Sequence, residues 1–72
     1  MTEVYEDVPH RLLRQRVRDI ASGAEGVLMA VVNENVGSVA YPRWVELAYI
    51  RLVSGREITT AVGNVEAADT GH

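Results

Sequence analysis

The residues best suited to binding stand at positions 41–44, where the sequence reads Tyr-Pro-Arg-Trp. Tyrosine, tryptophan and arginine contribute most to protein–protein interfaces, because they combine a large contact area with a polar group. We therefore expect a protein-binding surface formed by Tyr41, Arg43, Trp44 and Tyr49. The structural alternative is that Trp44, the only tryptophan, closes one end of a small core.

A second candidate site is the row Arg14, Arg16 and Arg18. Alternate residues of a strand share one face and lie about 6.6 to 7 Å apart, so three guanidinium groups in this row could follow a phosphate backbone. The alternative is a solvated face that offsets the acidity elsewhere, because residues 11–19 carry +3 (four arginines, one aspartate) and the remaining residues carry −6. Nucleic acid is therefore the alternative partner, and a protein is the leading one.

Catalysis has little support in the residue types present. The chain has no cysteine, and its two histidines, His10 and His72, stand near opposite ends. No serine has a histidine nearby in sequence, and no phosphate-binding glycine loop precedes a helix pattern. We expect a protein that is not an enzyme, with no cofactor, no metal ion and no small-molecule substrate.

Length and hydropathy suggest one small domain. A chain of 72 residues has a thin core, and the longest apolar run, from Val27 to Val32, is far shorter than the roughly 20 residues of a membrane helix. The first residues are acidic and do not resemble a signal peptide, so we expect a cytoplasmic protein with no membrane contact. The expected organisation is an acidic extension over 1–10, a β domain over 11–67 and a disordered tail over 68–72.

Turn residues and apolar runs predict several short strands. Residues 25–33 form an apolar run bounded by glycine and asparagine, which is typical of a buried strand, and 33–43 are expected to form a long loop. Residues 45–53 and 57–62 predict a hairpin around the turn 54–56, with Leu52 opposite Ile58. Residues 11–22 fit a helix or a strand equally well, because their apolar positions match both periods.

Five short segments carry a family resemblance: Val17-Arg18-Asp19, Gly26-Val27-Leu28-Met29, residues 48–52, residues 54–60 and Asn64-Val65-Glu66. In this order they resemble small actinobacterial proteins of unassigned function with the pattern Gly-Val-Val-Met, Leu-Arg-Pro and Gly-Gly-Arg-Glu-Trp. The chain departs from that pattern at Leu52, which replaces proline, at Ile58, which replaces tryptophan, and in having one fewer glycine before Arg56. The resemblance implies a small SH3-like β fold, with 17–19 in its first strand, and brings no known activity.

These observations predict an all-β protein, a small SH3-like barrel of about five short strands. The alternative is an α+β fold in which a helix over 9–22 packs on a three-stranded antiparallel sheet. The predicted function is a non-catalytic binding module that acts through protein–protein contacts. Self-association is part of this prediction. The run 27–32 is apolar on both faces, and a chain this short has few residues with which to bury both faces.

Overall fold

The computed structural model describes residues 5–68, which form one sheet of six antiparallel strands. The strands are β1 (Tyr5–Asp7), β2 (Arg16–Asp19), β3 (Glu25–Asn35), β4 (Trp44–Leu52), β5 (Glu57–Ala61) and β6 (Val65–Ala67), with a 3-10 turn, η1 (Val62–Asn64), between the last two. The all-β prediction is confirmed. The expected tail over 68–72 lies, apart from Ala68, outside the described residues.

The alternative helix over 9–22 is wrong. Residues 11–14 form turns, and 16–19 form β2, which pairs with β3 on one side and β6 on the other. Val17, at 0% exposure, is enclosed between those two partners. Pairing with strands distant in sequence, which periodicity does not report, decides the conformation of this segment.

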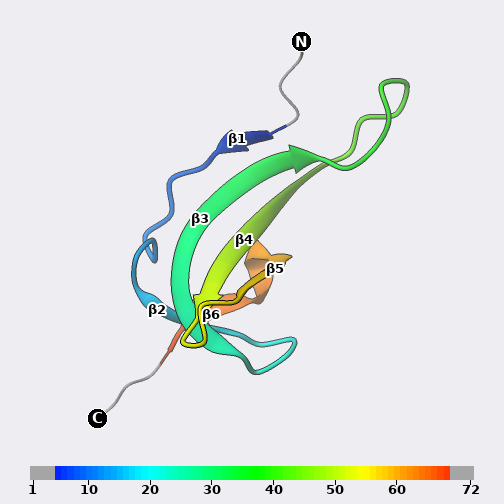
Figure 1. Ribbon diagram of the computed structural model, residues 1–72. Coiled ribbons are helices and arrows are strands. Elements are labelled where there is room, and N and C mark those ends of the chain that lie inside the picture. Colours follow the sequence, from blue (N-terminus) through cyan, green and yellow to red (C-terminus); the bar gives the residue numbers. More distant parts are fainter. Residues whose placement is uncertain (1–4, 69–72) are drawn as a thin grey trace.

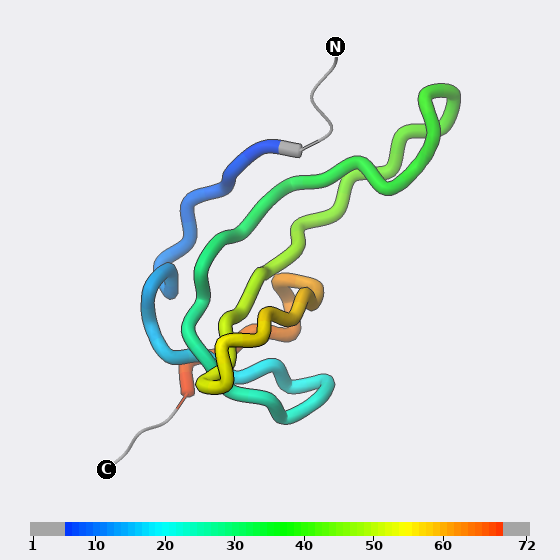
Figure 2. The backbone as a smooth tube through the Cα atoms, in the orientation of Figure 1, coloured from blue at the N-terminus to red at the C-terminus, as the bar shows by residue number. Residues whose placement is uncertain are grey.

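The strand order is β5-β4-β3-β2-β6, and β1 pairs with β3 beyond the end of β2. The sheet is strongly curved, so that β5 and β6, its two edge strands, are brought near each other around η1 (Figures 1 and 2). Residues 5–7 of the predicted acidic extension are therefore part of the sheet.

The strand β3 is apolar on both faces, and a β-bulge changes which of its residues face the core. The register with β4 shifts between Leu28 and Ala30, so Met29 is an extra residue. Because of the bulge, Leu28 before it and Val31 after it both face the concave side, where they pack with Ala48 and Ile50 of β4. All four are at most 1% exposed. One strand can therefore contribute to the core on both sides of the bend.

The hairpin of β4 and β5 has the expected faces and a different register. Ile50 lies opposite Ile58, and the loop contains residues 53–55, whereas the sequence suggested Leu52 opposite Ile58. The shift moves each partner by two residues, which leaves every side chain on its predicted face. Arg51 and Glu57 are directly opposed and form an ion pair at 2.9 Å. Both loops, expected and observed, contain three residues, and positive φ at Gly55 (90°) allows the observed turn.

The long loop expected over 33–43 is shorter than predicted. β3 continues to Asn35 and β4 begins at Trp44, so the loop contains only residues 36–43. The distal part of this hairpin, here called the arm (residues 33–46), extends beyond β2, β5 and β6, and β1 pairs with its base at Asn33 and Glu34 (Figures 1 and 2).

Candidate protein-binding site

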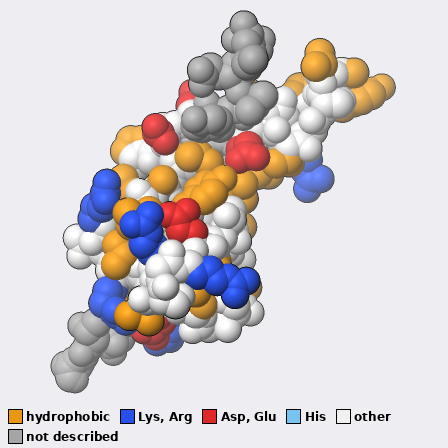
Figure 3. All heavy atoms as spheres, viewed as in Figure 1, with side chains coloured by type: hydrophobic (Ala, Val, Ile, Leu, Met, Phe, Trp, Pro, Cys, Tyr) orange, Lys and Arg blue, Asp and Glu red, His pale blue; other side chains and the backbone are white. Residues whose placement is uncertain are grey.

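The tip of the arm, residues 36–44, carries most of the exposed apolar side chains. Among the described residues, six large hydrophobic side chains are exposed, and four of them are Val36 (52%), Val39 (102%), Tyr41 (82%) and Trp44 (51%). Figure 3 shows hydrophobic side chains gathered at the end of the arm. Apolar side chains scattered singly are normal on a protein surface, whereas four within nine residues mark a candidate interaction site.

Hydrogen bonds within the arm hold the tip in shape. The Asn35 side-chain oxygen accepts from the backbone N–H groups of Gly37 and Arg43, both at 2.9 Å. The Ser38 N–H donates to the Tyr41 carbonyl at 3.1 Å, and the Tyr41 N–H donates to the Ser38 hydroxyl at 3.0 Å. A loop tied in this way presents its exposed side chains with little freedom to lose on binding, which favours affinity.

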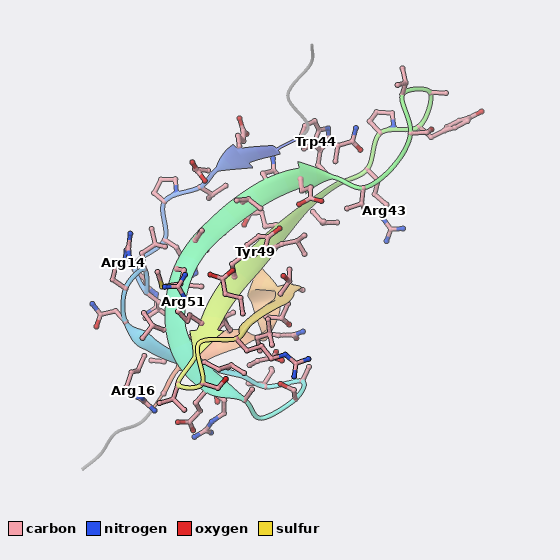
Figure 4. All side chains as sticks on the ribbon, in the orientation of Figure 1. Arg14, Arg16, Arg43, Trp44, Tyr49 and Arg51 are labelled. Carbon is pink, nitrogen blue, oxygen red and sulfur yellow. The ribbon has the colours of Figure 1, made fainter. Side chains whose placement is uncertain are left out.

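The four residues of the predicted surface do not lie together. Tyr41, Arg43 and Trp44 belong to the arm, but Trp44 and Arg43 point to opposite sides of it (Figure 4). Tyr49 lies five residues further along β4 and therefore on the face opposite Trp44. Trp44 is half exposed and does not belong to the core cluster, so it does not close the end of the core.

Tyr49 has a structural role on the convex face. It lies opposite Ala30, and its hydroxyl donates to the Glu34 carboxylate at 3.3 Å, four residues further along β3. To span that distance the tyrosine side chain must lie along the strand, past Val32. Val32 is only 6% exposed. The chain therefore covers part of its second apolar face itself.

The arginine row is only partly formed. Arg16 and Arg18 lie in β2, but Arg14 lies in the preceding turn with φ of 67°. The Glu25 carboxylate accepts hydrogen bonds from both β2 arginines, and Arg18 also contacts Glu66. The hydrogen bonds from Arg18, and secondly from Arg16, lower the pKa of Glu25.

These pairs give an expected result for nucleic acid. Because Glu25 and Glu66 occupy the guanidinium groups of Arg16 and Arg18, we expect weak binding to duplex DNA that Arg16→Glu leaves unchanged. A gel-shift titration at several salt concentrations measures this. Tight binding that falls steeply with salt and is lost in Arg16→Glu would contradict the expectation and support a nucleic-acid interface.

A buried carboxylate, Asp19, lies at the end of β2 and was not predicted from the sequence. It is 4% exposed and accepts hydrogen bonds from the hydroxyls of Ser22 (2.6 Å) and Thr60 (2.9 Å). The Ser22 bond, with smaller contributions from Thr60 and the Ala21 N–H, lowers its pKa against the opposing effect of burial. An aspartate followed three residues later by serine could have suggested the local turn. The bond to Thr60 of β5 depends on the curvature of the sheet.

Among residues 5–68 no group of three or more histidine, aspartate or glutamate side chains is placed to hold a metal ion. Within the same residues no helix is long and apolar enough to cross a membrane.

Comparisons of the chain with protein-family models, curated proteins and solved structures found no significant match. The resemblance to the small actinobacterial proteins therefore remains a prediction.

Proposed function

We propose that this protein is a non-catalytic binding module that contacts another protein through the tip of its arm. The observation that carries the proposal is the concentration of exposed apolar side chains at Val36, Val39, Tyr41 and Trp44. Tyrosine, tryptophan and arginine are favoured at the centres of interfaces, and Arg43 adds a cation on the side of the arm opposite Trp44. A cytoplasmic location fits the absence of cysteine.

We also propose that the curved sheet is a small SH3-like barrel. The order β5-β4-β3-β2-β6 and the short η1 turn between the two edge strands support this assignment. A second support is the hydrogen bond between Thr60 of β5 and Asp19 of β2, which joins strands that are not neighbours in the sheet. The family resemblance suggests the same fold.

Site-specific photo-crosslinking tests the binding proposal. A photoreactive amino acid at Val39, 102% exposed at the tip, is expected to crosslink a discrete protein in cells of the native host. Val53 is the matched control, because it is also a valine, is 100% exposed and lies in the β4–β5 loop outside the arm. We expect crosslinks at Val39 and none at Val53.

The same pattern of products at both positions, or no product at Val39, would refute the arm as the binding site. A second variant strengthens the test. Tyr41→Asp places a charge on a side chain that is 82% exposed, so the fold is expected to persist while the crosslink from Val39 falls at least tenfold. Circular dichroism checks the fold.

A further inference from the structure

One edge of the arm has an unpaired stretch of strand. β5 pairs with β4 only from Arg51 to Leu47, where its last residue, Ala61, lies opposite Leu47. Residues 44–46 pair with β3 on one side. Among residues 5–68, no strand pairs with these residues on the other side. We call residues 44–46 on this side the open edge.

The backbone direction at the open edge follows from two hydrogen bonds. The Leu52 N–H donates to the Arg56 carbonyl, so Leu52 faces β5, and the Arg43 carbonyl accepts from the Val36 N–H, so Arg43 faces β3. Successive residues of a strand direct their backbone N–H and C=O groups to alternate edges of the strand. Trp44 and Glu46 therefore direct their N–H and C=O groups outward. Such groups are a ready template for another strand.

We propose that the open edge pairs with the open edge of a second copy of this chain, antiparallel, with Trp44 opposite Trp44. The inference rests on the proposed role of the arm as an interface and names one partner for it. The contact is isologous, with a two-fold axis between the two Trp44 residues. In this register the two Trp44 backbones exchange two hydrogen bonds, and the indole rings become neighbours on one face.

The position of β5 selects this register. If Val45 lay on the axis, Arg43 would fall opposite Leu47 of the second copy, where Ala61 already lies. With Trp44 on the axis, Arg43 falls opposite Val45, where the edge is open. The strand does not continue far enough to meet β5 of the second copy, because the chain turns at the Ser38–Tyr41 hydrogen bonds.

Charge complementarity favours a second copy as the occupant. Arg43 is the arginine of the arm and forms no ion pair among the described residues, as is also true of Arg11, Arg14 and Arg56 outside the arm. In the proposed pairing Arg43 lies beside Val45 of the second copy, and Glu34 lies opposite that Val45 on the next strand. The Arg43 guanidinium group can therefore extend past Val45 of the second copy to the Glu34 carboxylate of that copy. Glu34 accepts one hydrogen bond from Tyr49 and has further acceptor positions.

Sedimentation equilibrium with tryptophan fluorescence tests the pairing. A contact this short belongs to the class of weak interfaces, so we expect monomers at micromolar concentration and dimers as the concentration approaches about 1 mM. Trp44 is the only tryptophan, so the emission reports on the contact itself. We expect the emission to shift to shorter wavelength with the same concentration dependence as the mass.

Glu46→Pro is the decisive variant. It removes an outward N–H and leaves the hydrogen bonds between β3 and β4 in place. We expect association to weaken at least tenfold. Thr59→Pro is the matched control, because Ile58 faces β4 and the exposed Thr59 N–H therefore points outward from β5. Thermal melts of both variants check that the fold persists.

A charge exchange provides an independent readout. Arg43→Glu is expected to weaken association through repulsion by Glu34 of the second copy, and adding Glu34→Arg to the same chain is expected to restore it. A monomer at all concentrations up to about 1 mM would overturn the inference. Association of Glu46→Pro equal to that of the wild type would also overturn it. If Glu46→Pro still crosslinks a different protein from Val39, the proposed function stands without the dimer.

Discussion

Gly26→Ala is expected to be the most damaging single substitution in the described chain. A Cβ at this position would overlap the Arg51 carbonyl oxygen, and would lie 2.8 Å from the carbonyl carbon and 2.9 Å from the Ile50 Cγ2 atom. Gly26 pairs with Val17 on one side and Leu52 on the other, so neither neighbouring backbone can move without breaking the centre of the sheet. Glycine is required here by the close approach of β4.

The expected loss is about 3 kcal/mol or more, the upper end of the range for overpacking a core. That is a large part of the total of roughly 4 to 11 kcal/mol expected for a domain of this size. Urea unfolding followed by circular dichroism measures it. Gly63→Ala is the matched control, because nothing lies within 4 Å of the added Cβ. Equal stabilities of the two variants would contradict this account of Gly26.

Asp19→Asn is expected to give the second largest effect, because the carboxylate joins β2 to the far edge of the sheet. The substitution replaces one acceptor oxygen by an amide donor facing the hydroxyls of Ser22 or Thr60. Asn64 also donates to the Thr60 hydroxyl at 3.2 Å, so the disturbance reaches η1. We expect a decrease in Tm on the order of 5 to 10 °C at neutral pH for a domain of this size.

The effect of Asp19 depends on pH with a defined sign. Its pKa is lower in the folded protein than the ordinary value of 3.8, chiefly through the Ser22 hydrogen bond. The stability it contributes is therefore complete above pH 3.8 and is lost as the pH falls through the folded pKa. The difference in Tm between wild type and Asp19→Asn should shrink over that range. Thermal melts at a series of pH values measure it.

Glu57→Gln serves as the control for the pH series. It removes one partner of the exposed Arg51–Glu57 pair, whose side chains are 52% and 44% exposed. Exposed pairs contribute about 0 to 1 kcal/mol, so this variant should melt close to the wild type. A difference between Asp19→Asn and wild type that persists unchanged in strong acid would show that the carboxylate charge is not responsible.

Much of the fold could be predicted from local sequence signals. The strand containing residues 25–33, the hairpin closed near Gly55 and the faces of Tyr49, Arg51 and Ile50 all follow from alternation and turn residues. The exact register of that hairpin did not follow, because a shift by two residues keeps every face and leaves the hydrophobic pattern unchanged.

The candidate site was predicted in part. The sequence singled out Tyr41, Arg43 and Trp44 by residue type, and the structure places them in one arm. Val36 and Val39 were missed, since isolated valines in an expected loop carry no signal of their own. Tyr49 was grouped with Trp44 because both are aromatic, although an odd spacing along one strand puts them on opposite faces.

The sequence by itself determined that this protein is built from short strands, with a thin core, no disulfide and an aromatic cluster near its centre, because composition, alternation and turn residues act over a few positions. Tertiary structure alone decided the strand at 16–19, the bulge at Met29, the burial of Asp19 and the open edge at Trp44. Each of these depends on which distant strand lies alongside and where that strand ends. Such pairing is a property of the whole curved sheet, and no local pattern encodes it.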